Sequence, residues 1–123
     1  MMSTEQIDSL RKKVRYKLLA CPFFLQGALL PIFTYVSGNL AWEHLVERVT
    51  SCMDAWHGTS DEDKQLLAES YYQETDALTK LYRICQQVDR TAPVDESALQ
   101  ESLLKLLQDY ADLPVVERQI YFL

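Results

Sequence analysis

Residues 22–36 read PFFLQGALLPIFTYV, and this stretch decides which fold the chain can adopt. It carries no charge, and its only conventionally polar side chains besides Tyr35 are Gln26 and Thr34. Because the segment is apolar on all sides, it has to be buried. Pro31 lacks an amide hydrogen and clashes with the preceding helical turn, so we expect a buried helix that is broken next to this proline.

A membrane-associated protein anchored by residues 18–36 is the alternative explanation of this stretch. Basic residues precede the run, as they do in short transmembrane and signal sequences. However, two prolines and Gly27 interrupt it, and insertion in a membrane would remove much of the core from the rest of the chain. We therefore favour a buried helical hairpin and expect no membrane partner.

The segments around this hairpin follow the three-to-four residue rhythm of amphipathic helices. Near the N-terminus, Ser3 and Gln6 fit a capping box ahead of the first apolar stripe. That stripe is Ile7, Leu10, Val14 and Leu18, and the clearest one, farther along, is Trp42, Leu45, Val46, Val49, Met53 and Trp56. Residues 37–39 are typical of a turn, and Gly58 is expected to end the helix of the second stripe in a left-handed conformation.

The second half of the chain predicts two further long helices. Ser60 is a suitable N-cap, and three acids follow it in the first turn. Residues 60–90 contain no Gly or Pro, so we expect one unbroken helix, roughly 45 Å long at about 1.5 Å per residue. Asp95 or Ser97 caps the last helix, which Pro114 interrupts.

The fold class follows from what these patterns share. No stretch alternates with a period of two residues, and no Asn-Gly or Asp-Gly turn suggests a hairpin of strands. The length of 123 residues suits one domain that buries its own core. The sequence therefore predicts an all-α, single-domain bundle over residues 1–123, with five to six helices and a Pro-broken, buried second helix.

Charge and cysteine usage indicate the kind of partner and compartment. The net charge is -6, but the first twenty residues carry +3, which leaves -9 on the remainder. An acidic body disfavours nucleic-acid binding and attracts basic partners. For the basic residues 11–17, three interpretations stay open: a solvated helix face, a contact for an acidic partner or for phosphates, and a membrane-flanking segment. Three widely spaced cysteines offer neither a complete disulfide framework nor a CxxC pair, so we expect a cytoplasmic protein.

Motifs for catalysis and cofactor binding are missing from the sequence. It has no Gly-rich phosphate loop, no G-x-S-x-G elbow and no H-E-x-x-H zinc motif. His44 and Glu47 have the spacing of a di-iron bundle ligand pair, but in the reverse order and without the second pair that such a site needs. We therefore expect no enzyme activity, cofactor or metal, and a helical-bundle metal-binding protein is a further alternative.

The leading functional hypothesis is a non-enzymatic protein-binding module, such as an inhibitor, immunity protein, adaptor or small regulatory subunit. It would act through an acidic and aromatic helical surface. Adjacent Tyr71 and Tyr72 cannot both face one core, so one of them should be exposed, and exposed tyrosines are common at binding hot spots. One predicted partner-binding patch is Glu69, Tyr72, Glu74 and Asp76, and the other is Tyr121 and Phe122. The expected partner is another, basic protein, with a homodimer as the alternative.

Overall fold

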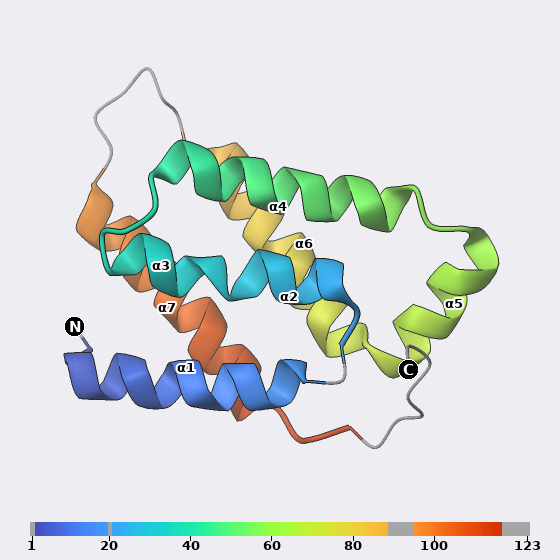
Figure 1. The fold of residues 1–123 in the computed structure, drawn as a ribbon, viewed down its shortest axis with the longest axis horizontal. Coiled ribbons are helices and arrows are strands. Elements are labelled where there is room, and N and C mark those ends of the chain that lie inside the picture. The colour runs from blue at the N-terminus through green and yellow to red at the C-terminus, as the bar shows by residue number, and fades with distance from the viewer. Residues whose placement is uncertain (1, 20, 89–94, 117–123) are drawn as a thin grey trace.

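The protein is an all-α, single-domain bundle, as predicted. A computed structural model describes residues 2–19, 21–88 and 95–116, and no strand occurs among them. The helices are α1 (Thr4–Leu18), α2 (Phe23–Leu29), α3 (Pro31–Val36), α4 (Trp42–His57), α5 (Asp61–Ser70), α6 (Tyr72–Gln87) and α7 (Glu96–Asp112). Because α2 and α3 follow each other directly across Leu30, with Pro31 as the first residue of α3, they are the two parts of one Pro-broken helix. Counted in this way, the described part of the chain has six helices. The two parts continue in one line (Figure 1), so the prediction that this stretch folds back as a hairpin is wrong.

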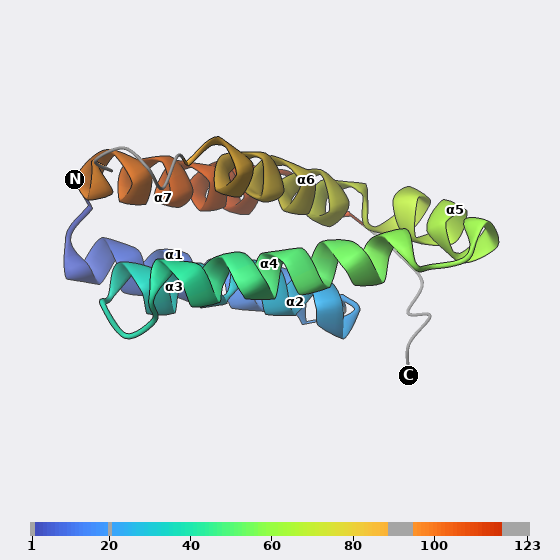
Figure 2. The same cartoon turned by 90° about the horizontal axis from the view of Figure 1, so that it is seen from above.

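The helices are arranged in two layers (Figures 1 and 2). One layer holds α1, the α2–α3 pair and α4, and the other holds α6 and α7, with α5 at one end of the bundle. Within the first layer, α2 packs against α4, and across the layers α2 and α4 both contact α6 while α1 contacts α7. Of the described helices, the first and the last therefore lie against each other.

Much of the apolar stretch 22–36 lies in the core between the layers. Its buried side chains belong to one cluster that also includes the inner faces of α1, α4, α6 and α7. Those that are at most 1% exposed are Leu25, Ala28, Leu29 and Ile32. Burial in the domain therefore accounts for the apolar character of these positions, while Gly27, Leu30 and Thr34 of the same stretch are partly or well exposed. Among the described helices, none is both long enough and apolar enough to cross a membrane.

The predicted helix starts are confirmed by their hydrogen bonds. The Gln6 amide donates to Ser3 Oγ over 3.2 Å, and the Ser3 amide donates to Gln6 Oε1 over 2.8 Å, which completes the capping box of α1. Ser60 caps α5 by accepting a hydrogen bond from the Asp63 amide. Of the two candidate caps for α7, Asp95 is the N-cap.

The prediction of one unbroken helix over residues 60–90 is wrong. The chain bends at Tyr71, whose φ of -125° and ψ of 32° are not helical, and α5 and α6 lie on either side of it. The side chain of Tyr71 is 0% exposed, whereas Leu67 is the only buried residue of α5. A straight helix over residues 60–90 would extend beyond the core. Packing of α6 against α2, α4 and α7 therefore outweighs the helix propensity of this segment.

The left-handed glycine is Gly38 rather than Gly58. Gly38 has a φ of 84° and closes α3, with its amide donating to the Tyr35 carbonyl and the Asn39 amide donating to the Thr34 carbonyl. Gly58 keeps right-handed angles at the end of α4. There the last turn needs no change of hand, because the Thr59 side chain and the amides that follow the helix already bond its final carbonyls.

Candidate functional site

The structure separates the members of the first predicted patch. Tyr72 is 52% exposed while Tyr71 is fully buried, which confirms that one of the two tyrosines faces solvent. Asp76 lies one turn after Tyr72 on the exposed side of α6, but it pairs with Lys80 over 2.9 Å, so its charge is compensated. Glu69 is exposed on α5, on the other side of the bend at Tyr71 from Tyr72 and Asp76. The second patch, Tyr121 and Phe122, lies outside the described residues.

Assignment of Glu74 to an exposed patch is wrong. Its side chain is 0% exposed, and its Oε2 accepts a hydrogen bond from the Tyr110 hydroxyl of α7. Glu74 shares the inner face of α6 with Leu78 and Leu81, four and seven residues later, both of which are buried. The helical spacing in the sequence already indicates that Glu74 lies on the buried face. The prediction of an exposed position gave more weight to its negative charge.

Beside this pair, Lys17 fastens α1 to α6 and α7. Its Nζ donates to Gln73 Oε1 over 2.6 Å, to the Tyr110 carbonyl over 3.0 Å and to the Leu113 carbonyl over 3.1 Å. The two carbonyls belong to the C-terminal end of α7, where a positive charge is favourable. Lys17 therefore has a structural role and does not belong to an exposed basic face.

Between α6 and α7 lies a groove of about 330 Å³ with balanced charges. Its lining includes Ala77, Leu106 and the members of two ion pairs. These pairs are Asp76 with Lys80 at 2.9 Å and Lys105 with Asp109 at 3.4 Å, all of them well exposed. The groove therefore presents no net charge to a partner, and exposed pairs of this kind contribute little energy.

The opposite side of the molecule, formed by α1, the α2–α3 pair and α4, has a surface lined by arginines. One hollow there, of about 410 Å³, lies between α1 and α3, and its lining includes Arg11 and Arg15. A second hollow, of about 260 Å³, is lined by α2, α3 and Arg48 of α4. Leu30 and Thr34 line both hollows, so the two form one continuous surface, which we call the arginine groove.

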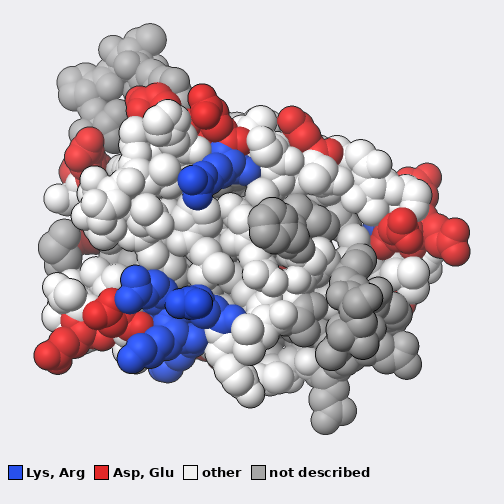
Figure 3. Space-filling view, in the orientation of Figure 1, with Lys and Arg blue, Asp and Glu red and all other residues white. Residues whose placement is uncertain are grey.

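Figure 3 shows this face: basic side chains gather over α1, another lies over α4, and uncharged surface separates them. The uncharged surface follows from the sequence, because residues 18–42 contain no Asp, Glu, Lys or Arg. On α1 the stripe of Leu10, Val14 and Leu18 faces the core, which leaves Arg15 on the exposed side. On α4, Arg48 is likewise exposed between buried Leu45 and Val49.

The arginines of this groove differ in how they are paired. Arg11 contacts Asp8 over 3.0 Å, with both side chains about half exposed. In the part of the chain that the structure describes, no carboxylate lies within 4.0 Å of the nitrogens of Arg15 or Arg48. These two guanidinium groups therefore give the groove a positive charge that has no ion-pair partner among the described residues, although the chain as a whole is acidic.

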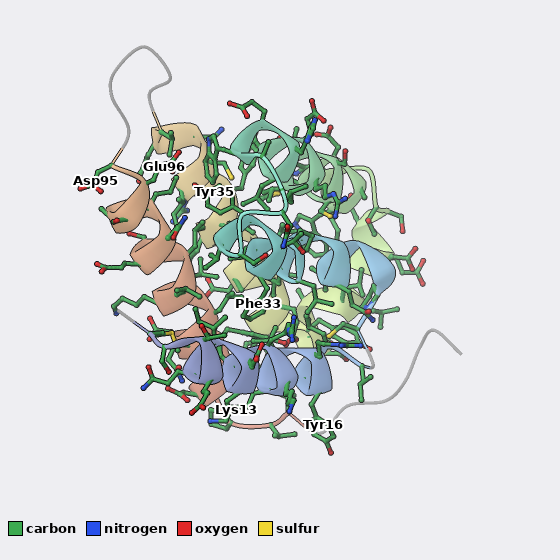
Figure 4. All side chains as sticks on the ribbon, turned by 60° about the vertical axis from the view of Figure 1, so that its left-hand side comes forward. Lys13, Tyr16, Phe33, Tyr35, Asp95 and Glu96 are labelled. Atoms are coloured by element: carbon green, nitrogen blue, oxygen red, sulfur yellow. The ribbon has the colours of Figure 1, made fainter. Side chains whose placement is uncertain are left out.

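The outer side of α1 extends this basic character away from the groove. Lys13 and Tyr16 project from the bundle there, as Figure 4 shows. Tyr16 is 74% exposed. The basic segment of residues 11–17 therefore has three orientations: Lys17 points inward, Arg11 and Arg15 line the groove, and Lys13 points outward. The sequence alone does not show which basic residue takes which orientation.

The other candidate groups are potential metal ligands, which lie far apart, and cysteine thiols, which have low reactivity. Among the described residues, no three His, Cys, Asp or Glu side chains lie close enough together to hold a metal ion. Burial raises the pKa of the Cys52 thiol, and it raises the pKa of Cys85 to about 11. Both thiols are therefore protonated at neutral pH and are poor nucleophiles.

Tyr35 is similarly kept in its neutral form. Burial, and then the nearby carboxylates of Glu96 and Glu43, raise the pKa of its phenol. Figure 4 places Tyr35 and Glu96 at the same end of the bundle, on α3 and at the start of α7. Its ring packs against Trp42 with the centroids 5.4 Å apart, which is the geometry of an aromatic contact in a core.

Comparison of the chain with protein-family models, with curated proteins and with solved structures found no match.

Proposed function

We propose that the protein is a non-enzymatic protein-binding module, of the kind represented by inhibitors, adaptors and small regulatory subunits, and that it binds through the arginine groove. One observation carries this proposal. Arg15 of α1 and Arg48 of α4 line the same surface, and neither has a carboxylate partner among the described residues.

The composition of the groove supports a protein partner. Binding surfaces commonly combine a charged rim with a less polar centre, and arginine is enriched at their energetic hot spots. In the arginine groove, Gly27, Leu30 and Pro31 provide the uncharged centre between the arginines. Because Leu30 and Thr34 join the two hollows, a partner segment can contact both at once.

A second candidate surface is centred on Tyr72. Its half-exposed ring at the start of α6 is the observation that favours it. However, this surface loses Glu74 to the core and has the charge of Asp76 balanced by Lys80. Of its three predicted acids only the exposed Glu69 then remains, which leaves it little acidic character to distinguish it from ordinary helix surface.

Recovery of partners from an extract of the native cells distinguishes the two surfaces. The full chain is used as bait, together with Thr34→Trp, which fills the junction of the hollows without changing charge, and Tyr72→Ala as the matched control. We expect the recovery of at least one protein to fall about tenfold with Thr34→Trp, which corresponds to about 1.4 kcal/mol of binding energy, and to stay unchanged with Tyr72→Ala.

Two results would contradict this assignment. If no protein responds to Thr34→Trp while the variant keeps its helical circular dichroism spectrum, the arginine groove is not a binding surface. If recovery is lost with Tyr72→Ala alone, the partner binds the α6 surface. Direct titration of the purified partner against both variants then measures the loss.

A further inference from the structure

We infer that the occupant of the arginine groove is an acidic segment of the partner protein, with carboxylates that contact Arg15 and Arg48. This inference rests on the proposed function, and it adds the chemistry of the partner. The segment lies across the α2–α3 pair, from α1 to α4, and places uncharged side chains over Leu30 and Thr34.

Charge complementarity is the first argument. Of the three basic side chains that line the groove, only Arg11 has a carboxylate partner among the described residues, and that partner, Asp8, comes from its own helix. The α2–α3 pair adds no charge, because residues 18–42 have none. A guanidinium group presents a planar fork of donors that fits both oxygens of a carboxylate. Two such forks at the two ends of an uncharged strip favour a segment with acids at both ends.

The distance between the arginines suggests the spacing of those acids. They belong to helices on either side of the α2–α3 pair (Figure 1). Closely packed helices have axes about 8–10 Å apart, and two such spacings set a lower bound on the order of 20 Å for the span from α1 across the pair to α4, because α1 packs mainly against α7. An extended chain advances about 3.3 Å per residue, and at least about six residues therefore separate the two acidic groups of the segment.

A protein segment fits this surface better than a nucleic acid does. Nucleic acids present a dense row of phosphates, and their binding requires a broad basic surface. Here the chain carries -6 overall and -9 outside its first twenty residues, which repels a long polyanion. In addition, the partly exposed Leu30 offers an apolar contact that an apolar side chain of a peptide can use.

The test uses synthetic peptides that share one apolar framework. The acidic peptide carries Glu pairs at two positions about six residues apart, and its matched versions carry Gln or Lys in their place. Fluorescence anisotropy measures their affinity for the full chain at low and at physiological ionic strength. We expect the Glu peptide to bind about tenfold more tightly than the Gln peptide at low ionic strength, and less so when salt screens the charges.

Variants of the protein locate the binding. The double substitution Arg15→Gln and Arg48→Gln should weaken binding of the Glu peptide about tenfold. The matched control, Lys80→Gln with Lys105→Gln, removes the same charge from the opposite layer and should change the affinity less than about twofold. An equal loss with both double variants would mean that only the net charge matters, and it would overturn the inference.

Two further outcomes overturn the inference in different ways. Equal binding of the Glu and Gln peptides would show that the groove does not select acids. Tighter binding of a single-stranded oligonucleotide than of the Glu peptide, lost with the arginine variant, would make the surface a phosphate site. If a native partner is lost with Thr34→Trp but still binds the arginine variant, the proposed function stands and the acidic occupant is ruled out. If no native partner responds to Thr34→Trp, both the proposed function and the acidic occupant are ruled out.

Discussion

At the level of single residues, Glu74 stands out as the one buried charged side chain among the described residues. It is fully buried, and the Tyr110 hydroxyl donates a hydrogen bond to it from the neighbouring helix. A buried polar group is costly when it loses a partner, because it recovers no hydrogen bond to water. The pair therefore makes the contact of α6 with α7 sensitive to a single oxygen atom.

Tyr110→Phe should lower the free energy of unfolding by about 1–3 kcal/mol, because it removes the hydroxyl that bonds Glu74 and keeps the ring. Tyr72→Phe makes the same chemical change on a half-exposed ring, and it should cost less than about 0.5 kcal/mol. Urea denaturation of both variants measures the difference. Equal stabilities would mean that the buried hydrogen bond contributes nothing.

Ionisation of Cys85 should weaken the fold in alkaline solution. Its pKa is about 11 in the folded protein, against an ordinary value of 9.0, because burial disfavours the thiolate. The folded state therefore holds this proton more tightly than the unfolded state does. The contribution to stability is complete below pH 9 and is lost as the pH rises from 9 to 11.

Denaturation curves recorded over that pH range check this expectation. Cys85→Ala removes the titrating group, so the stability of the variant should fall less steeply with pH than that of the natural chain. Tyr35 and Cys52 also have raised pKa values, and they remain in both proteins. The difference between the two curves therefore isolates Cys85, and parallel curves would show that its ionisation is not coupled to unfolding.

At the level of elements, the helices with a clear apolar stripe and a cap could be predicted from the sequence. The starts of α1 and α5, the buried faces of α1 and α4 and the break at Pro31 follow from local chemistry, which acts within a few residues. The bend at Tyr71 could not be predicted, because no Gly or Pro marks it. It depends on contacts of α6 with helices that lie far away in the sequence.

Two glycines with opposite requirements test the local geometry. Gly38 has a φ of 84°, a region that a side chain disfavours, so Gly38→Ala should destabilise the protein by about 1 kcal/mol. Gly27 lies within α2, where an added methyl group would be 3.6 Å from Cys52 Sγ, an ordinary contact. Gly27→Ala should therefore stabilise the protein by up to about 1 kcal/mol through helix propensity.

Thermal unfolding of both variants decides whether this assignment is correct. The two substitutions are chemically identical, so their different effects report the local backbone, and a Gly38→Ala variant that is as stable as the natural chain or more stable would mean that the handedness at Gly38 has been assigned wrongly. A destabilised Gly27→Ala alone would indicate that α2 approaches α4 more closely than the distance to Cys52 implies.

At the level of the whole molecule, the distribution of charge results from the fold. Arg15 and Arg48 lie far apart in the chain, and they line one surface only because α1 and α4 lie on either side of the α2–α3 pair. The sequence predicted the basic segment of α1 and the uncharged stretch separately. It could not predict that Arg48 joins them, since no periodicity connects residues on different helices.

Lys17 should matter for the cohesion of the two layers. Lys17→Met keeps most of the apolar stem and removes the hydrogen bonds to Gln73 and to the end of α7, so it should cost about 1–3 kcal/mol of stability. Lys13→Met, on the outward side of the same helix, is the matched control and should be within about 0.5 kcal/mol of the natural chain. Amide hydrogen exchange should then rise at the C-terminal end of α7 in the first variant alone. Similar exchange in both variants would contradict a role for Lys17 in holding α7.

The bonds from Lys17 to the carbonyls of Tyr110 and Leu113 connect residues 93 and 96 positions apart. During translation, the first helix leaves the ribosome long before these acceptors have been polymerised. At about 5–20 residues per second, the interval between them is about 5–20 seconds. The apolar side of α1 is therefore not covered by α7 until the end of that interval, and chaperones that recognise such surfaces can bind it once α1 has left the ribosome.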